Sequence, residues 1–162
     1  MKNRGEDEAG MLKALGSGLA GAFALTVIHE TARRYIEDAP RMDVVGMRAI
    51  AKTFRAVDAE PPVPLHETAL VGELVSNSLY YGLVGLGDPE DGMRNGAALG
   101  LAAGLAAVYL PEPLGLGRQP AKNSTETNLL TVAFYLLGGL AAGAAYQALS
   151  ADEAEARPSG RA

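Results

Sequence analysis

The chain has 162 residues, enough for one domain, and 48% of them are hydrophobic. It has no cysteine, which excludes disulfides and thiolate metal sites, and its net charge of −5 argues against a nucleic-acid partner. Strand-forming residues are scarce, whereas Ala, Leu and Gly fill four apolar blocks, so the composition predicts an all-α fold. We interpret residues 11–150 as a single domain, with 1–10 and 151–162 as disordered tails.

The first apolar block, 12–29, is long enough to cross a bilayer. The residues before it are too acidic for a secretory signal, so we expect a retained membrane span. The block contains the motif G-x-G-x-x-G, from Gly16 to Gly21, which binds dinucleotides only where a strand precedes it. Because the preceding residues are weak strand formers, we interpret these glycines as a close contact between two membrane helices.

A polar segment follows, and 41–57 within it has the spacing of an amphipathic helix. Its apolar side chains lie on one side and its basic side chains on the other. Two interpretations remain open: an interfacial helix with its basic face toward lipid phosphates, or a solvated helix packed on the bundle. The basic residues considered for contact with lipid or phosphate are Arg34, Arg41 and Arg48.

The second apolar block, 65–86, is the most informative because it carries Glu73 and Asn77 near its middle. A carboxylate at that depth of a bilayer is costly, and such residues usually have a function. In a helix, the spacing of seven, four and three residues would place four polar side chains on one face. They are His66, Glu73, Asn77 and Tyr80.

The third and fourth blocks predict spans at 93–110 and 128–149. The short connection at 87–92 predicts that the second and third spans are antiparallel neighbours. The spacing G-xxx-G occurs twice in the third block, at Gly96, Gly100 and Gly104, and once in the fourth, at Gly139 and Gly143, and it predicts tight helix contact in lipid. We expect Asn123 or Ser124 to cap the fourth helix.

These elements predict an integral membrane four-helix bundle, with an amphipathic interfacial helix between spans one and two and both termini on one side. A small excess of basic residues on the loops favours a cytoplasmic position for 30–64, in a prokaryotic inner membrane. The partners that we expect are membrane lipids, with a homo-oligomer or a larger membrane complex as further options.

The ionisable residues converge on the end of the bundle that holds the long loops, which predicts a pocket opening there and reaching down to Glu73. His29 and His66 each begin a His-Glu-Thr-Ala segment, but their spacing matches no established metal motif, so we predict no metal site and assign no cofactor. The predicted pocket comprises Glu73, Asn77, His66, Tyr80, His29, Glu30 and Arg33.

Three functions are compatible with this pattern. The preferred one is binding or transport of a small polar solute, ion or proton at Glu73. The others are a membrane enzyme acting on lipid headgroups and a non-catalytic subunit that uses its glycine faces to bind other chains. For the enzyme, the roles would go to Glu73 or Asp43 as base, His29 or His66 as acid or ligand, and Arg33 with Arg34 as phosphate clamp.

Overall fold

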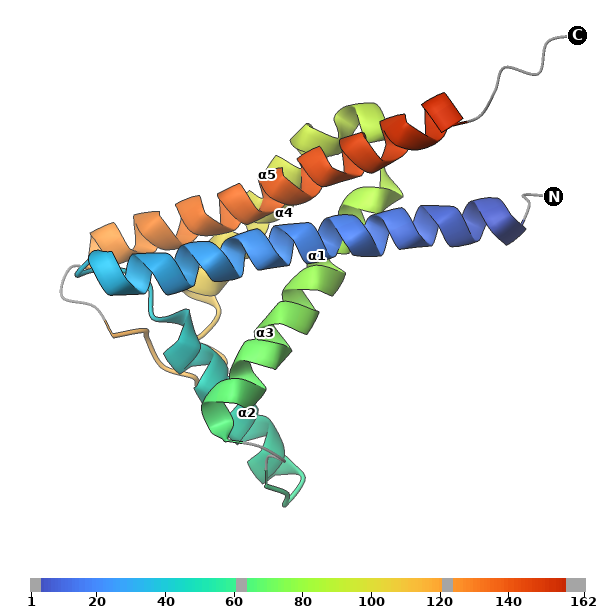
Figure 1. The fold of residues 1–162 in the computed structure, drawn as a ribbon. Helices are drawn as coiled ribbons and strands as arrows, with labels where there is room; N and C mark the ends of the chain where they lie inside the picture. The colour runs from blue at the N-terminus through green and yellow to red at the C-terminus, as the bar shows by residue number, and fades with distance from the viewer. Residues whose placement is uncertain (1–3, 61–63, 121–123, 157–162) are drawn as a thin grey trace, which may run out of the picture.

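The computed structural model describes residues 4–60, 64–120 and 124–156, and within these ranges it contains helices and no strand (Figure 1), which confirms the all-α prediction. Two 3₁₀ turns, η1 (Leu83–Leu86) and η2 (Pro89–Asp91), join the third helix to the fourth. The five α-helices are α1 (Arg4–Tyr35), α2 (Met42–Ala56), α3 (Leu65–Gly82), α4 (Gly92–Tyr109) and α5 (Ser124–Ala156).

The long helices α1 and α5 run side by side, and the first turn of α1 and the last turn of α5 lie at the same end of the molecule (Figure 1). Helix α1 begins inside the stretch expected as a tail, and α5 continues past residue 150. Acidic residues follow the start of α1, where the helix dipole favours them. The amphipathic helix expected at 41–57 is present as α2, and the capping prediction for Asn123 lies outside the described residues.

The second and third apolar helices, which were predicted to pack as neighbours, make only a small contact with each other. Helix α3 packs mainly on α1 and α2, whereas α4 packs mainly on α5. Small residues decide these pairings, because Gly18 of α1 lies against the backbone of α3 at Ser78 and Gly82. The turns η1 and η2 let the chain change direction, so α3 and α4 diverge despite their short connection.

The contact between α4 and α5 is made by glycines from both helices. A Cβ atom placed on Gly100 would lie 2.6 Å from the carbonyl oxygen of Tyr135, and one on Gly104 would lie 2.7 Å from the Cα of Val132. Because these neighbours are backbone atoms, no side chain fits without moving a helix. The glycines of the G-x-G-x-x-G motif lie inside α1, where a Cβ atom placed on Gly21 would lie 2.7 Å from the carbonyl oxygen of Gly138.

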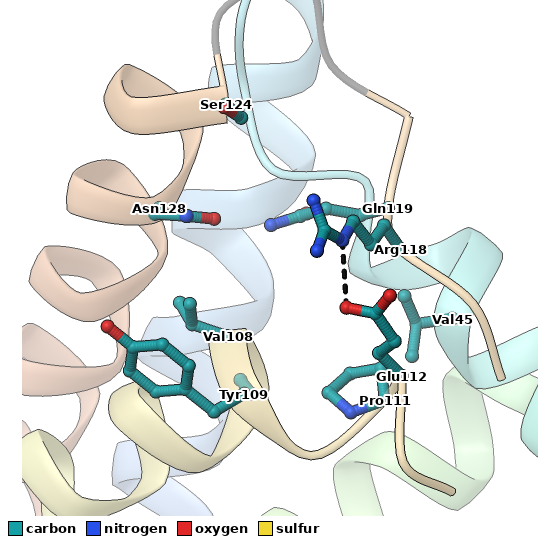
Figure 2. A pocket seen from close by; sticks show the side chains of 10 residues that line it. Val45, Val108, Tyr109, Pro111, Glu112, Arg118, Gln119, Ser124 and Asn128 are labelled. Atoms are coloured by element: carbon teal, nitrogen blue, oxygen red, sulfur yellow. Dashed lines mark hydrogen bonds and ion pairs between the residues drawn. The ribbon is translucent and has the colours of Figure 1, made fainter. Parts of the chain in front are cut away.

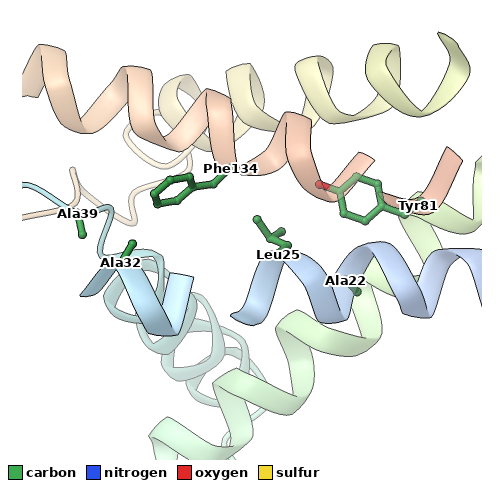
Figure 3. Packing of buried hydrophobic residues seen from close by; sticks show 7 residues of the cluster. Ala22, Leu25, Ala32, Ala39, Tyr81 and Phe134 are labelled. Atoms are coloured by element: carbon green, nitrogen blue, oxygen red, sulfur yellow. The ribbon is translucent and has the colours of Figure 1, made fainter. Parts of the chain in front are cut away.

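The buried core contains mostly small residues, while many large apolar side chains face outward. Alanines of α1, α3 and α5 are buried, and Figure 3 shows Leu25 and Phe134 between α1 and α5, with Tyr81 reaching toward α5. Leu25 is 1% exposed, but Phe23 on the same helix is 63% exposed. Other exposed side chains form stripes at Leu12, Leu15, Leu19 and Val27 of α1 and at Val71, Val75 and Leu79 of α3.

Two helices are long and apolar enough to cross a membrane: α1 over Glu8–Tyr35 and α5 over Ser124–Ala151. This finding rests on length and composition alone. No other helix in the described ranges passes the same test: α3 and α4 are long enough with 18 residues each, but their polar groups make them too little apolar. The four-span bundle therefore stays a prediction.

Replacing Tyr81 with phenylalanine is expected to lower the free energy of unfolding by about 1 kcal/mol. Its ring is fully buried, and its hydroxyl donates a hydrogen bond to the carbonyl oxygen of Tyr135 at 2.8 Å. Denaturation of the purified protein measures the change. Tyr35→Phe is the matched control, because Tyr35 is 82% exposed and should leave stability unchanged.

Candidate functional site

Glu73 lies in a small cavity between α1, α2 and α3, which we call the Glu73 pocket. The cavity has a volume of about 20 Å³. This is room for roughly one water-sized species, because a water needs at least about 10–15 Å³ on this measure. The polar side chains that line the pocket are Thr26, His29, Glu30, Arg33, Asp43 and Glu73.

The Glu73 side chain is half-buried and lies directly over Gly46 of α2, where an added Cβ would overlap the Oε1 atom. Within the described residues, no hydrogen bond or ion pair reaches this carboxyl group. The charges that act on it are those of Asp43 and Glu30, which have the same sign. Glu73 is thus a carboxyl group held among helices without a protein counter-ion in the described part of the chain.

A chain of ion pairs joins α1 to the start of α2 beside the pocket. Arg33 pairs with Glu30 on its own helix and lies 3.5 Å from Asp43. Arg41 binds both oxygens of Asp43, each at 2.9 Å. Burial opposes the ionisation of Asp43, but the hydrogen bond from Arg41 and the charges of Arg41 and Arg33 outweigh it and hold the pKa of Asp43 below its usual value.

His29 contributes an imidazole ring to the pocket from α1. Its ring packs edge-on against Phe134 and Tyr135 of α5, with centroids 5.5 and 5.7 Å apart. The Nε2 atom is buried and has no hydrogen-bond partner among the described residues. One side of the imidazole is therefore fixed by aromatic packing, and the residue also lines the Glu73 pocket.

The structure brings together four of the seven residues predicted for the pocket: Glu73, His29, Glu30 and Arg33. Asn77 and Tyr80 instead line a wide hollow of about 670 Å³ between α3 and α4, which we call the α3–α4 groove. The Tyr80 hydroxyl donates to the carbonyl oxygen of Leu99 at 3.0 Å. His66 is half-buried in the first turn of α3, roughly 10 Å along the helix axis from Glu73.

A second polar cavity, of about 220 Å³, lies where the segment after α4 meets α2 and α5 (Figure 2). We call it the loop pocket. Glu112 and Arg118 form an ion pair of 2.8 Å at its wall, and Figure 2 shows Gln119 and Asn128 pointing into it from opposite sides. The only sequence signal was the two charges on a Gly- and Pro-rich segment, because Gln119 and Asn128 belong to no motif.

The basic residues of α2 hold the segment that borders the loop pocket. Arg48 donates to the carbonyl oxygens of Leu116 and Arg118 at 3.0 and 2.9 Å, and Lys52 donates to that of Leu114 at 2.6 Å. Arg34 is exposed at the end of α1. Lipid contact by Arg34, Arg41 and Arg48 stays a prediction, although Arg41 and Arg48 already donate to protein groups.

Within the described ranges, no three His, Asp or Glu side chains converge as a set of metal ligands. His29 lies in the Glu73 pocket, whereas His66 does not line it. Comparison of the chain with family models, with curated proteins and with solved structures gives no match. The geometry of the two pockets is therefore the basis for a functional hypothesis.

Proposed function

We propose that this chain is an integral membrane protein in which Glu73 binds a proton or a small cation. Small residues inside and large apolar residues outside support the membrane setting, because lipid, unlike water, favours an apolar surface. In this proposal α1 and α5 span the bilayer, and α3 and α4 complete a four-span bundle. Helix α2 lies at the loop end, in the interface, and 30–64 faces the cytoplasm of a prokaryotic cell.

The unpaired carboxyl group of Glu73 is the observation that carries the proposal. The pocket and the adjoining ion pairs hold three carboxyl groups, those of Glu30, Asp43 and Glu73, and two guanidinium groups, those of Arg33 and Arg41. Three negative and two positive charges leave one negative charge, which one proton or one monovalent cation would balance. A carboxylate in an apolar setting beside like charges holds such a partner firmly.

The size of the Glu73 pocket limits the kinds of ligand that can fit in it. About 20 Å³ admits a proton, with or without a water molecule, or a single ion, but no larger polar solute. The enzyme hypothesis receives less support, because Asp43 already binds two arginines and is a poor proton acceptor.

Substitution of Glu73 by glutamine is expected to abolish proton or cation binding while keeping the shape of the pocket. The full chain is reconstituted in vesicles, and uptake is followed with an internal pH dye and with Na⁺ and K⁺ indicators. Infrared spectra recorded across a pH titration follow the protonated carboxyl band of Glu73. Glu67→Gln is the matched control, because Glu67 is exposed one turn and a half earlier on α3.

The proposal requires that Glu73→Gln loses both uptake and the carboxyl band, whereas Glu67→Gln keeps both. Helical content and thermal unfolding of the two variants establish that they fold alike. If folded Glu73→Gln retained uptake and bound the same ion, Glu73 would not be the binding group.

A further inference from the structure

The loop pocket and the α3–α4 groove adjoin each other at the loop end of the molecule. Three residues line both hollows: Val45 of α2, Ala107 of α4 and Pro111. A ligand that reaches past these residues therefore contacts a polar cavity of about 220 Å³ and a wide groove of about 670 Å³. This is the arrangement that an amphiphile requires, with a polar head on one side and a chain on the other.

The groove owes its width to small residues on α4. Ala103, Ala106 and Ala107 face it, while the larger Leu101 and Leu105 of the same helix are exposed elsewhere. Helices α3 and α4 make only a small contact with each other, and residues of α2 and α5 also line the groove between them. Its volume lies within the range of about 300–1,000 Å³ found for small-molecule sites, and most of its wall is apolar.

Among the described residues that line it, the loop pocket offers one group of each charge. Glu112 and Arg118 are 60% and 80% exposed, so their ion pair contributes at most about 1 kcal/mol and a ligand can replace it. Arg118 suits a phosphate, and Glu112 suits an ammonium group that donates hydrogen bonds. The amide of Asn128 can bond to either part of such a headgroup. The amide of Gln119 already accepts from the backbone N–H of Arg41 and donates to the Thr131 hydroxyl, so it offers the headgroup its second N–H.

We infer that this composite site binds a glycerophospholipid with a phosphoethanolamine headgroup, which sits in the loop pocket while an acyl chain lies in the α3–α4 groove. A primary ammonium group supplies N–H donors to Glu112, whereas the trimethylammonium of choline has none. An anionic headgroup without an ammonium group places its negative charge near the carboxylate of Glu112, which repels it. The inference shares the membrane setting of the proposed function, but it does not depend on proton or cation binding at Glu73.

Native mass spectrometry of the detergent-solubilised full chain tests the headgroup. The protein is titrated with phosphatidylethanolamine, phosphatidylcholine and phosphatidylglycerol of identical acyl chains, and with soluble glycerophosphoethanolamine. Phosphatidylethanolamine should bind about tenfold more tightly than the other lipids, equivalent to about 1.4 kcal/mol. The soluble compound should not compete, because it cannot occupy the groove. The experiment measures no proton or cation binding, so a negative result for lipid binding is distinguishable from a negative result for Glu73.

Two variants test the two halves of the site. Ala107→Leu fills the shared wall and should lower phosphatidylethanolamine affinity about tenfold, whereas Ala102→Leu, on an exposed part of α4, should leave it unchanged. Glu112→Gln should remove the preference for ethanolamine over choline. Because the Glu112 side chain is exposed, this variant should fold, and it tests the headgroup site even where Ala107→Leu fails to fold. The inference would be overturned if the native chain bound the three lipids equally or bound phosphatidylglycerol more tightly. It would also be overturned if Glu112→Gln kept the preference for ethanolamine, or if folded Ala107→Leu kept wild-type affinity.

Discussion

Replacing Gly100 by valine is expected to separate α4 from α5 and to cost about 3 kcal/mol of stability, the upper end for overpacking. A Cβ on Gly100 would lie 2.6 Å from the carbonyl oxygen of Tyr135 and 2.7 Å from the Cα of Leu136. Both atoms belong to the backbone of α5, so no rotamer change relieves the clash. The helices must move apart, and the neighbouring glycine contact between Gly96 and Gly139 is lost with them.

Chemical or thermal unfolding of the protein in detergent, followed by circular dichroism, measures this effect. Leu101→Val is the matched control, since Leu101 is the next residue of α4 and is 46% exposed. It should change stability by no more than about 0.5 kcal/mol. Equal stability of the two variants would mean that α4 and α5 do not pack through their glycines.

Asp43→Asn is expected to loosen α2 from α1 and to remove about 1.5–3 kcal/mol of stability, as for hydrogen bonds to charged groups. Asp43 binds Arg41 through both oxygens and also pairs with Arg33, so the neutral amide leaves Arg41 without its counter-ion among the described residues and removes the link to Arg33, which keeps Glu30. The Asp43 side chain is only 10% exposed, which limits solvation by water in its place.

The pH dependence of stability provides a second readout for the same pair. The pKa of Asp43 is lower in the folded chain than the unfolded value of about 3.9, so the stabilisation is fully present above that value. It is lost as the pH falls below about 4 and through the folded pKa. Melting temperatures between pH 3 and 7 should show this loss in the native chain and a smaller one in Asp43→Asn.

Asp88→Asn serves as the control for both measurements, because Asp88 is exposed in the turn before η2. It should have the stability and the pH profile of the native chain. If Asp43→Asn kept the same acid-induced loss as the native chain, the ion pairs of Asp43 would not join α2 to α1.

Much of the candidate site follows from local periodicity. The spacing of Glu30 and Arg33 predicts that they share one face of α1, with His29 beside them, at the loop end of the molecule. The carboxylate of Glu73 within an apolar block indicates that α3 is the helix that meets them. Helix formation and the face on which a side chain lies depend on neighbours three and four residues away. The all-α fold and the amphipathic helix α2 could be predicted for the same reason.

The pairing of helices depended on contacts that periodicity does not describe. A short connection suggested that α3 and α4 are neighbours, yet α4 fits α5 because Gly100 meets the backbone at Leu136, residues far apart in the chain. The divergence of α3 from α4 then moved Asn77 and Tyr80 out of the Glu73 pocket and into the groove. The loop pocket likewise could not be predicted, because its polar lining comes from segments with no shared motif.

The sequence therefore determined which residues form helices and where an apolar stretch carries the costly carboxyl group of Glu73. Tertiary structure alone decided that Glu73 lies over Gly46 without a counter-ion in the described residues, while Asp43 takes both arginines. The physical reason is that helix propensity acts over one or two turns, whereas charge pairing and close packing depend on the distance between surfaces that the chain brings together only when it folds.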